Sequence, residues 1–144
     1  MLKTLTTLII FLVPWSTSAG QLLSISLKDP HQVIWQKEVN SGESFQIVHR
    51  NSIYGALVRE AFQLDDQGSL WLKDIKTDHP AVLEYYGLEE ASTQWIPLER
   101  KFEYLAIRIT QNGEFWVIVG KEKIPLSLLV ADGSLVEVRG SQAR

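Results

Sequence analysis

The sequence predicts an all-β fold, an antiparallel β-sandwich, with a small closed β-barrel as the alternative. Apolar and polar residues alternate in several short runs, for example in residues 23–27 and 104–109, which is the period of a half-buried β-strand. Turn signals separate these runs about every ten residues. An Asn-Gly dipeptide at 112–113 and an Asp-Gly dipeptide at 132–133 lie between such runs and favour tight turns. Short strands spaced in this way are typical of a sandwich or a barrel.

Residues 1–19 have the organisation of a secretory signal peptide. Lys3 supplies a basic start, and residues 5–13 form an apolar segment that is too short to span a bilayer comfortably. The small residues that end at Ala19 match the pattern that a signal peptidase reads. We therefore expect cleavage after Ala19, a periplasmic or extracellular location, and a single all-β domain formed by residues 20–144. An uncleaved N-terminal anchor is the alternative.

The composition excludes several classes of partner and of crosslink. The chain of 144 residues has a formal net charge of −3 and no basic run, which argues against nucleic acid as a partner. It has no cysteine, so a lipid anchor on an N-terminal cysteine and disulfide bonds are both excluded. Its three histidines lie far apart in sequence, so we expect neither a metal site nor a cofactor. We expect no transmembrane segment after signal cleavage.

Short strands are expected along the whole chain after the signal peptide, with one interruption. Between residues 78 and 92 the pattern has neither a helical nor a strand period, so we expect a long loop with room for one helical turn. Hairpin turns are expected at residues 65–68, 111–114 and 132–133. Residues 115–119 are apolar on both faces, which indicates a central strand. The expected strands are residues 23–27, 33–39, 45–49, 58–64, 70–72, 95–97, 104–109, 115–119, 124–130 and 135–138.

The segment 50–64 contains the main conflict between pattern and charge. In its strand, Glu60 alternates with three apolar residues, so a carboxylate falls on the apolar face. A buried carboxylate needs a charged partner or several hydrogen bonds. The nearest donors in sequence belong to Asn51 and Ser52. We therefore expect these two residues to hydrogen-bond a turn and their backbone amides to bind Glu60.

The same segment and the loop that follows provide the candidate binding residues. Six residues are expected to contact a ligand or a partner: Asn51, Ser52, Tyr54, Glu60, Tyr85 and Tyr86. No catalytic residue is expected in this interpretation, because the common catalytic motifs are missing. The alternative is a small hydrolase in which Ser52, His49 and Glu60 act as nucleophile, base and orienting group.

Residues 51–62, Asn-Ser-Ile-Tyr-Gly-Ala-Leu-Val-Arg-Glu-Ala-Phe, resemble the defining motif of a bacterial family of exported proteins. This family is catalogued as domain of unknown function number eighteen-fifty. Its pattern is His-Ser-Val, four variable positions that often end in Pro-Val, and then x-Glu-x-Phe. The matching positions are Ser52, Val58, Glu60 and Phe62. Asn51 stands where the family usually has His, and Leu57 stands where it often has Pro.

The resemblance implies a small exported protein that is often encoded beside TRAP transporters of the TAXI type, which import organic anions. No activity or cofactor comes with it. We therefore expect a non-catalytic accessory or binding module, with transporter components or a small organic ligand as partners. The alternatives are the periplasmic hydrolase described above and a structural protein of the cell envelope.

Overall fold

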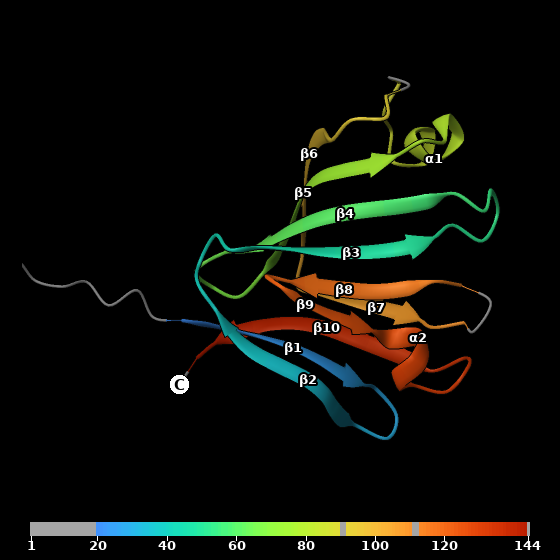
Figure 1. The fold of residues 1–144 in the computed structure, drawn as a ribbon. Coiled ribbons are helices and arrows are strands. Elements are labelled where there is room, and N and C mark those ends of the chain that lie inside the picture. Colours follow the sequence, from blue (N-terminus) through green and yellow to red (C-terminus); the bar gives the residue numbers. More distant parts are fainter. Residues whose placement is uncertain (1–19, 90–91, 111–112, 144) are drawn as a thin grey trace, which may run out of the picture.

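The computed structural model describes residues 20–89, 92–110 and 113–143, and the expected signal peptide lies outside these ranges. Two antiparallel sheets pack face to face and do not close into a barrel, which confirms the predicted β-sandwich (Figure 1). The smaller sheet consists of β1 (Gln21–Leu27), β2 (Gln32–Val39), β7 (Tyr104–Arg108) and β10 (Leu135–Gln142), in the order β2-β1-β10-β7. The larger sheet consists of β3 (Ser44–Arg50), β4 (Leu57–Leu64), β5 (Leu70–Thr77), β6 (Ile96–Phe102), β8 (Phe115–Val119) and β9 (Glu122–Pro125), in the order β6-β5-β4-β3-β8-β9.

Two short helices accompany the sheets. The first, α1 (Pro80–Tyr85), begins with a proline at its first turn, where a missing N–H is tolerated. It lies in the region 78–92, for which we expected a long loop with one helical turn; residues 90–91 lie outside the described ranges. The second is α2 (Leu126–Leu129). No helix in the described part of the chain has the length and apolar character needed to cross a membrane.

The hairpin expected at residues 65–68 is confirmed, and Asp65 organises it. One carboxylate oxygen of Asp65 accepts hydrogen bonds from the backbone N–H groups of Gln67 at 3.0 Å and Ser69 at 2.9 Å. The other accepts one from the indole N–H of Trp71 at 3.1 Å. Partial burial raises the pKa of Asp65, but the hydrogen bonds that it accepts outweigh this effect and hold the pKa below its ordinary value.

The other two expected hairpins are wrong. β7 and β8 were expected to pair through residues 111–114, but β7 pairs with β10, and β8 pairs with β3 and β9 in the other sheet. Residues 111 and 112 lie outside the described ranges. The expected strand 124–130 ends at Pro125, where α2 follows, and β10 pairs with β1 and β7 instead. An Asn-Gly dipeptide favours a turn locally, but it does not decide which sheet each flanking strand joins. The central position expected for residues 115–119 is confirmed.

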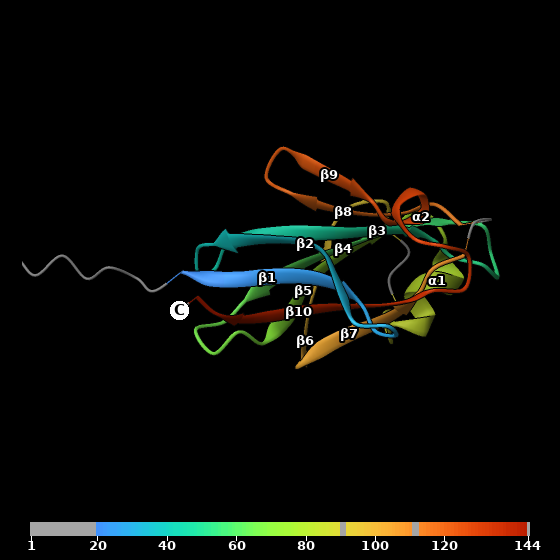
Figure 2. The same cartoon turned by 90° about the horizontal axis from the view of Figure 1, so that it is seen from below.

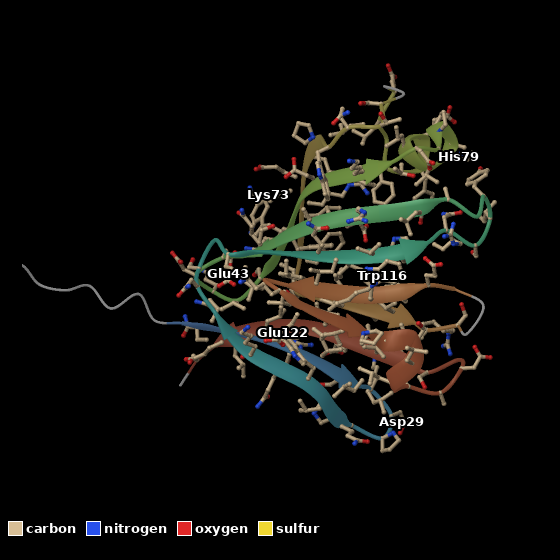
Figure 3. The ribbon with its side chains drawn as sticks, in the orientation of Figure 1. Asp29, Glu43, Lys73, His79, Trp116 and Glu122 are labelled. Carbon is tan, nitrogen blue, oxygen red and sulfur yellow. The ribbon has the colours of Figure 1, made fainter. Side chains whose placement is uncertain are left out.

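The two long sides of the sandwich are built differently. On one side, β2 and β9 are edge strands of opposite sheets, and the Glu122 carboxylate bridges them (Figure 3). It accepts hydrogen bonds from the Trp35 indole at 3.1 Å and the Lys37 ammonium at 2.8 Å. On the other side, β6 and β7 are also edge strands of opposite sheets, joined through Glu103 (Figure 2). From that corner they diverge, and the sandwich stays open between them.

One end of the sandwich is closed by backbone contact between the sheets. Gly68, in the turn between β4 and β5, lies against Gly140 on β10, and a Cβ added to Gly140 would overlap the Gly68 carbonyl oxygen. The side-chain amides of Gln21 and Gln142 donate to the carbonyl oxygen of Asp66 at 3.1 and 3.2 Å. Because a side chain at Gly140 would push the two sheets apart, this close approach requires glycine.

The apolar core of the described residues forms two clusters, and Glu60 lies at the seam between them. The main cluster fills the space between the sheets and contains Phe62, whereas the second lies next to α1 and contains Val58. On β4, Glu60 stands between these two buried residues. Tyr86 and Leu98 pack against both clusters. Val58, Glu60 and Phe62 thus share one face of β4, and Glu60 is the one of the three that belongs to neither cluster.

Candidate functional site

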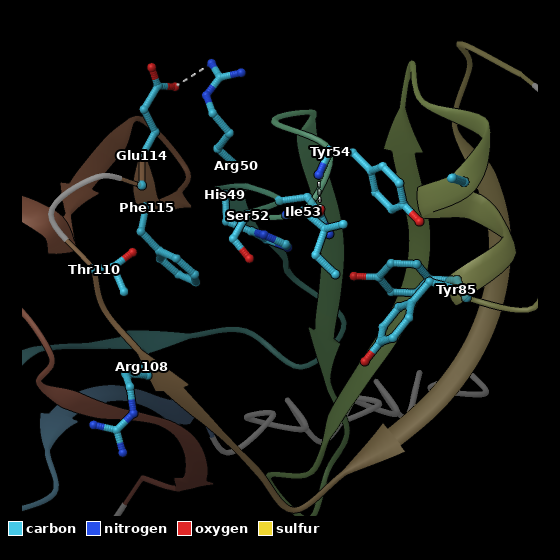
Figure 4. Close-up of a pocket in the computed structure, with 14 residues that line it drawn as sticks. His49, Arg50, Ser52, Ile53, Tyr54, Tyr85, Arg108, Thr110, Glu114 and Phe115 are labelled. Carbon is cyan, nitrogen blue, oxygen red and sulfur yellow. Dashed lines mark hydrogen bonds and ion pairs between the residues drawn. The ribbon is translucent and has the colours of Figure 1, made fainter.

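A cleft opens on the side of the sandwich where β6 and β7 diverge. Its inner part has a volume of about 460 Å³ and is lined by side chains of β3, β4, β6 and β7. Its mouth, a second hollow of about 460 Å³, extends past the turn after β3 to α1 and the start of β8 (Figure 4). The two parts share five lining residues: His49, Tyr85, Tyr86, Arg108 and Phe115. We call the two parts together the cleft.

The Glu60 carboxylate is nearly buried in the inner part of the cleft, with its side chain 14% exposed. The hydroxyl of Tyr86 donates a hydrogen bond to one of its oxygens at 2.6 Å. The Nε2 atom of His49 lies 3.5 Å from the other. The expectation that the backbone amides of Asn51 and Ser52 would bind Glu60 is wrong. The N–H of Asn51 donates to the carbonyl of Ala56 within the turn, at 2.7 Å, and the contacts of Glu60 come instead from Tyr86, directly after α1, and from His49 on the neighbouring strand β3.

Tyr86 is positioned by the end of α1. Gly87, with a φ of +76°, reverses the chain, and its N–H donates to the carbonyl of Glu84 at 2.9 Å. The guanidinium of Arg100 donates to the carbonyl of Tyr86 and lies 5.7 Å from the centre of its ring. Burial raises the pKa of the Tyr86 hydroxyl far above its ordinary value, and the charge of Glu60 adds to the effect. Tyr86 is therefore a neutral hydrogen-bond donor to Glu60.

His49 joins the inner part of the cleft to its mouth. It lies on β3, where its ring stacks on Phe115 of β8 with the ring centres 5.6 Å apart. One face of the ring is thus covered, and its Nε2 edge faces Glu60. The side chain is 22% exposed, so a ligand in the cleft can reach it. This arrangement gives the cleft a polar group that can donate or accept a hydrogen bond.

The turn after β3 shapes the rim of the mouth. The Asn51 side chain accepts hydrogen bonds from the backbone N–H groups of Ile53 and Tyr54, both at 3.0 Å, so the expectation that it holds a turn is confirmed. Gly55 closes the turn with a φ of +64°. The side chains of Ile53 and Tyr54 are therefore presented to solvent. The Tyr54 ring stacks on His79, at the start of α1, at a centre-to-centre distance of 4.7 Å.

The structure brings the six predicted contact residues to one cleft but gives them different roles. Asn51, Ser52 and Tyr54 line the mouth, Glu60 lines the inner part, and Tyr85 and Tyr86 line both. Asn51 is occupied by its own turn. The expectation that Ser52 also hydrogen-bonds the turn is wrong, because its side chain is exposed and makes no hydrogen bond with the described residues.

Sequence reasoning missed the residues that the opposite sheet and the outer strands contribute. Arg100 and Phe102 come from β6, Arg108 comes from β7, and Phe115 comes from β8. The alternation of apolar and polar residues in a strand indicates only which face of the sheet each of these side chains occupies. Because β7 and β8 join different sheets, no local signal could place Arg108 and Phe115 on opposite walls of one cleft.

The charges in the cleft are unevenly paired. In the mouth, Arg50 forms an ion pair with Glu114 at 3.3 Å. In the inner part, Arg100 and Arg108 donate to backbone carbonyls and make no ion pair with a carboxylate among the described residues. Glu60 is the acidic residue that lines this inner part. Arg100 therefore shares the inner part with Glu60, whereas Arg108 lies at its rim, on the opposite face of β7 from the inward-pointing Leu105 and Ile107. Neither guanidinium is paired with a carboxylate of the described residues, which favours an anionic group in a ligand.

The arrangement contains part of what a hydrolase would need. His49 and Glu60 have the relation of a base and its orienting carboxylate, although 3.5 Å exceeds a good hydrogen bond. No hydrogen bond joins Ser52 to His49 in the described ranges. No group of three potential metal ligands occurs among the described residues. The cleft thus offers hydrogen bonds, positive charge and aromatic surface.

Comparison with known proteins gives no further guidance. The chain matches no family model, no curated protein and no solved structure.

Proposed function

We propose that this protein is an exported, non-catalytic binding module and that the cleft is its ligand-binding site. One observation carries the proposal: the Arg100 guanidinium and the hydrogen-bonded carboxylate of Glu60 lie among apolar and aromatic side chains in a cleft that the fold leaves open, with Arg108 at its rim. A fold that needed only stability would cover such a surface, because buried polar groups stabilise a protein less than well-packed apolar ones. Concave apolar sites with a few converging polar groups are typical of ligand binding.

The rim of the cleft supports the same proposal. Ile53, Tyr54 and Tyr85 are among the most exposed large apolar residues of the described chain, and all three line the mouth. Solvent exposure of such side chains is unfavourable, and their gathering at one opening indicates an interaction surface. Aromatic side chains also provide large contact area at a low entropic cost when a ligand binds.

The accessory role beside a TRAP-type organic-anion transporter is part of the proposal and rests on the resemblance of residues 51–62 to the family motif. Export rests on residues 1–19. Mass spectrometry of the periplasmic fraction tests export: we expect a chain that begins at Gly20, and an intact Met1 terminus in the cytoplasm would contradict it. Transporter genes beside the coding gene would support the accessory role, and an isolated gene would remove its support.

Ligand-dependent stabilisation tests the binding proposal. We would measure melting temperatures with a panel of organic mono- and dicarboxylates and short acidic peptides, since a ligand that binds only the folded state raises stability. A true ligand should stabilise the wild type and the control variant Leu128→Ala, and should stabilise Tyr85→Ala less. Tyr85 and Leu128 are both 82% exposed, but only Tyr85 lines the cleft. Equal stabilisation of all three proteins, or no stabilisation by any compound, would reject the proposal.

A hydrolase is the second candidate, because His49 and Glu60 lie together in the cleft that Ser52 also lines. An ester and amide substrate panel tests it. Turnover that is lost in Ser52→Ala would establish the hydrolase and overturn the non-catalytic proposal. Turnover that survives in Ser52→Ala would come from another source.

A further inference from the structure

We propose that the occupant of the cleft is an extended peptide segment of a partner protein, which pairs with the free edge of β7 and adds a strand to the smaller sheet. This inference rests on the proposed function and specifies the class of ligand. Four features carry it: the free edge of β7, its lack of protection, the apolar floor beside it, and the charges around it.

The free edge of β7 offers unpaired backbone groups to the cleft. In the smaller sheet, β7 pairs with β10 on one side, and no strand of the described residues pairs with it on the other. Just beyond β7, the N–H of Ile109 donates to Ser134 at 2.9 Å, toward the β10 side. Hydrogen-bonding direction alternates along an antiparallel strand, so Leu105 and Ile107 also bond toward β10. The N–H and C=O groups of Tyr104, Ala106 and Arg108 therefore point toward the open side.

The other edge strands of this fold carry proline, lysine or covering contacts that oppose strand pairing, and the short strand β7 carries none of these three. β6 contains Pro97 and the charged run 99–101, and β9 ends in Pro125. The β2 edge is bridged to β9 by Lys37 and Glu122. Proline, lysine and covering contacts are the common means by which proteins block exposed edges. The β7 sequence, Tyr-Leu-Ala-Ile-Arg, has neither proline nor lysine, so this edge is available for pairing.

The space beside β7 has the shape that an added strand requires. Ile47, Phe62 and Phe102 of the opposite sheet line the inner part of the cleft, together with Leu105 and Ile107. A strand placed in line with β7 would point every second side chain at this apolar floor. The five residues of β7 correspond to about 17 Å of extended chain, at about 3.4 Å per residue.

The charges favour an acidic segment. Arg100 lines the inner cleft beside Glu60, the carboxylate of the described lining, whose hydrogen bond from Tyr86 is internal to the protein, and Arg108 lies at the rim on the outward face of β7. An Asp or Glu side chain, or a carboxyl terminus, would pair with these guanidinium groups. The whole chain is negative, with a net charge of −3, so this local excess of positive charge distinguishes the cleft from the remaining surface. The partner segment is thus about five residues long, alternately apolar, and acidic.

Phage-displayed random nine-residue peptides, panned against the exported protein, test this inference. Two substitutions at one exposed position separate strand pairing from other modes of binding. Ala106→Pro removes the N–H that faces the open side, where an edge strand tolerates proline, and Ala106→Val keeps it. We expect selected peptides to bind the wild type and Ala106→Val alike and to bind Ala106→Pro at least about tenfold more weakly, by the loss of a backbone hydrogen bond and by steric exclusion.

Backbone methylation of a selected peptide gives a readout that does not depend on the folding of a protein variant. Methylating alternate amides should abolish binding, and methylating the amides between them should not. Peptides that bind Ala106→Pro as tightly as the wild type, or panning that enriches nothing, would overturn the inference. If organic carboxylates then raised the melting temperatures of the wild type and of Ala106→Pro equally, the cleft would still be a binding site, but one that does not use strand pairing. If neither peptides nor carboxylates bound, the proposed function would fail as well.

Discussion

Replacing Tyr86 by phenylalanine removes one hydroxyl group and leaves the ring in place. That hydroxyl donates the 2.6 Å hydrogen bond to Glu60. Its loss leaves a nearly buried carboxylate with His49 at 3.5 Å as its remaining partner in the described structure. The neighbouring substitution Tyr85→Phe is a matched control, because the Tyr85 side chain is 82% exposed and its hydroxyl makes no hydrogen bond with the described residues.

The magnitude follows from the burial and charge of the acceptor. A hydrogen bond to a charged group contributes about 1.5–3 kcal/mol, and little water can replace the lost hydroxyl when Glu60 is 14% exposed. We expect Tyr86→Phe to lower the free energy of unfolding by about 1.5–3 kcal/mol and Tyr85→Phe to change it by less than about 0.5 kcal/mol. For a domain of this size the larger loss lowers the melting temperature by about 5–10 °C.

Denaturant melts of both variants and the wild type at pH 7 measure the difference. The difference between wild type and Tyr86→Phe should also narrow above pH 10, the ordinary pKa of tyrosine. Because the pKa of Tyr86 is raised in the folded state, its contribution is present below pH 10 and is lost as the pH rises further. Equal stability of Tyr86→Phe and Tyr85→Phe would refute the view that Tyr86 holds Glu60 in the cleft.

Three further substitutions test other parts of the fold. Glu60→Gln should destabilise the protein by about 1–3 kcal/mol, and the exposed control Glu84→Gln should cost less than about 0.5 kcal/mol; equal melting midpoints would contradict a structural role for Glu60. Asp65→Asn should cost about 1–2 kcal/mol at pH 7. Because the folded-state pKa of Asp65 is lowered, the wild type should lose this advantage as the pH falls below about 4, and an unchanged difference at pH 3 would contradict the assignment. Gly140→Ala should destabilise the protein by more than about 1 kcal/mol, because its added Cβ would overlap the Gly68 carbonyl oxygen, and a melting midpoint equal to that of the wild type would contradict this close approach.

The sequence was sufficient to predict the sandwich and most strand positions, because alternation within a strand reports burial on one face. Strand pairing was harder to predict. The hairpin expected at residues 65–68 was right because Asp65 and Gly68 form a turn whose own hydrogen bonds decide its geometry. The hairpin expected at 111–114 was wrong because the flanking strands join different sheets, and that choice depends on contacts distant in sequence.

In the candidate site, too, local sequence patterns were informative and contacts between residues distant in sequence were not predictable. The conflict between the charge of Glu60 and its apolar face identified the central residue of the cleft from sequence alone. Its partner Tyr86 lies 26 residues away and reaches it because Gly87 ends α1. The two arginines of the inner cleft come from β6 and β7, whose divergence depends on how the sheets pack. A strand pattern places Arg100 on the same face of β6 as Leu98 and Phe102, but it does not indicate that this face borders an opening.

Backbone amide signals in a heteronuclear NMR spectrum locate the binding surface when a peptide selected by panning is titrated into the protein. If the peptide occupies the cleft, signals of β7, of the inner residues of β6 and of the end of α1 near Tyr86 should shift. Signals of β2 and β9 around the Glu122 bridge should remain unchanged, because that side of the sandwich is closed. Shifts centred on β2 and β9, with the signals of β7 unchanged, would show that the peptide does not bind in the cleft.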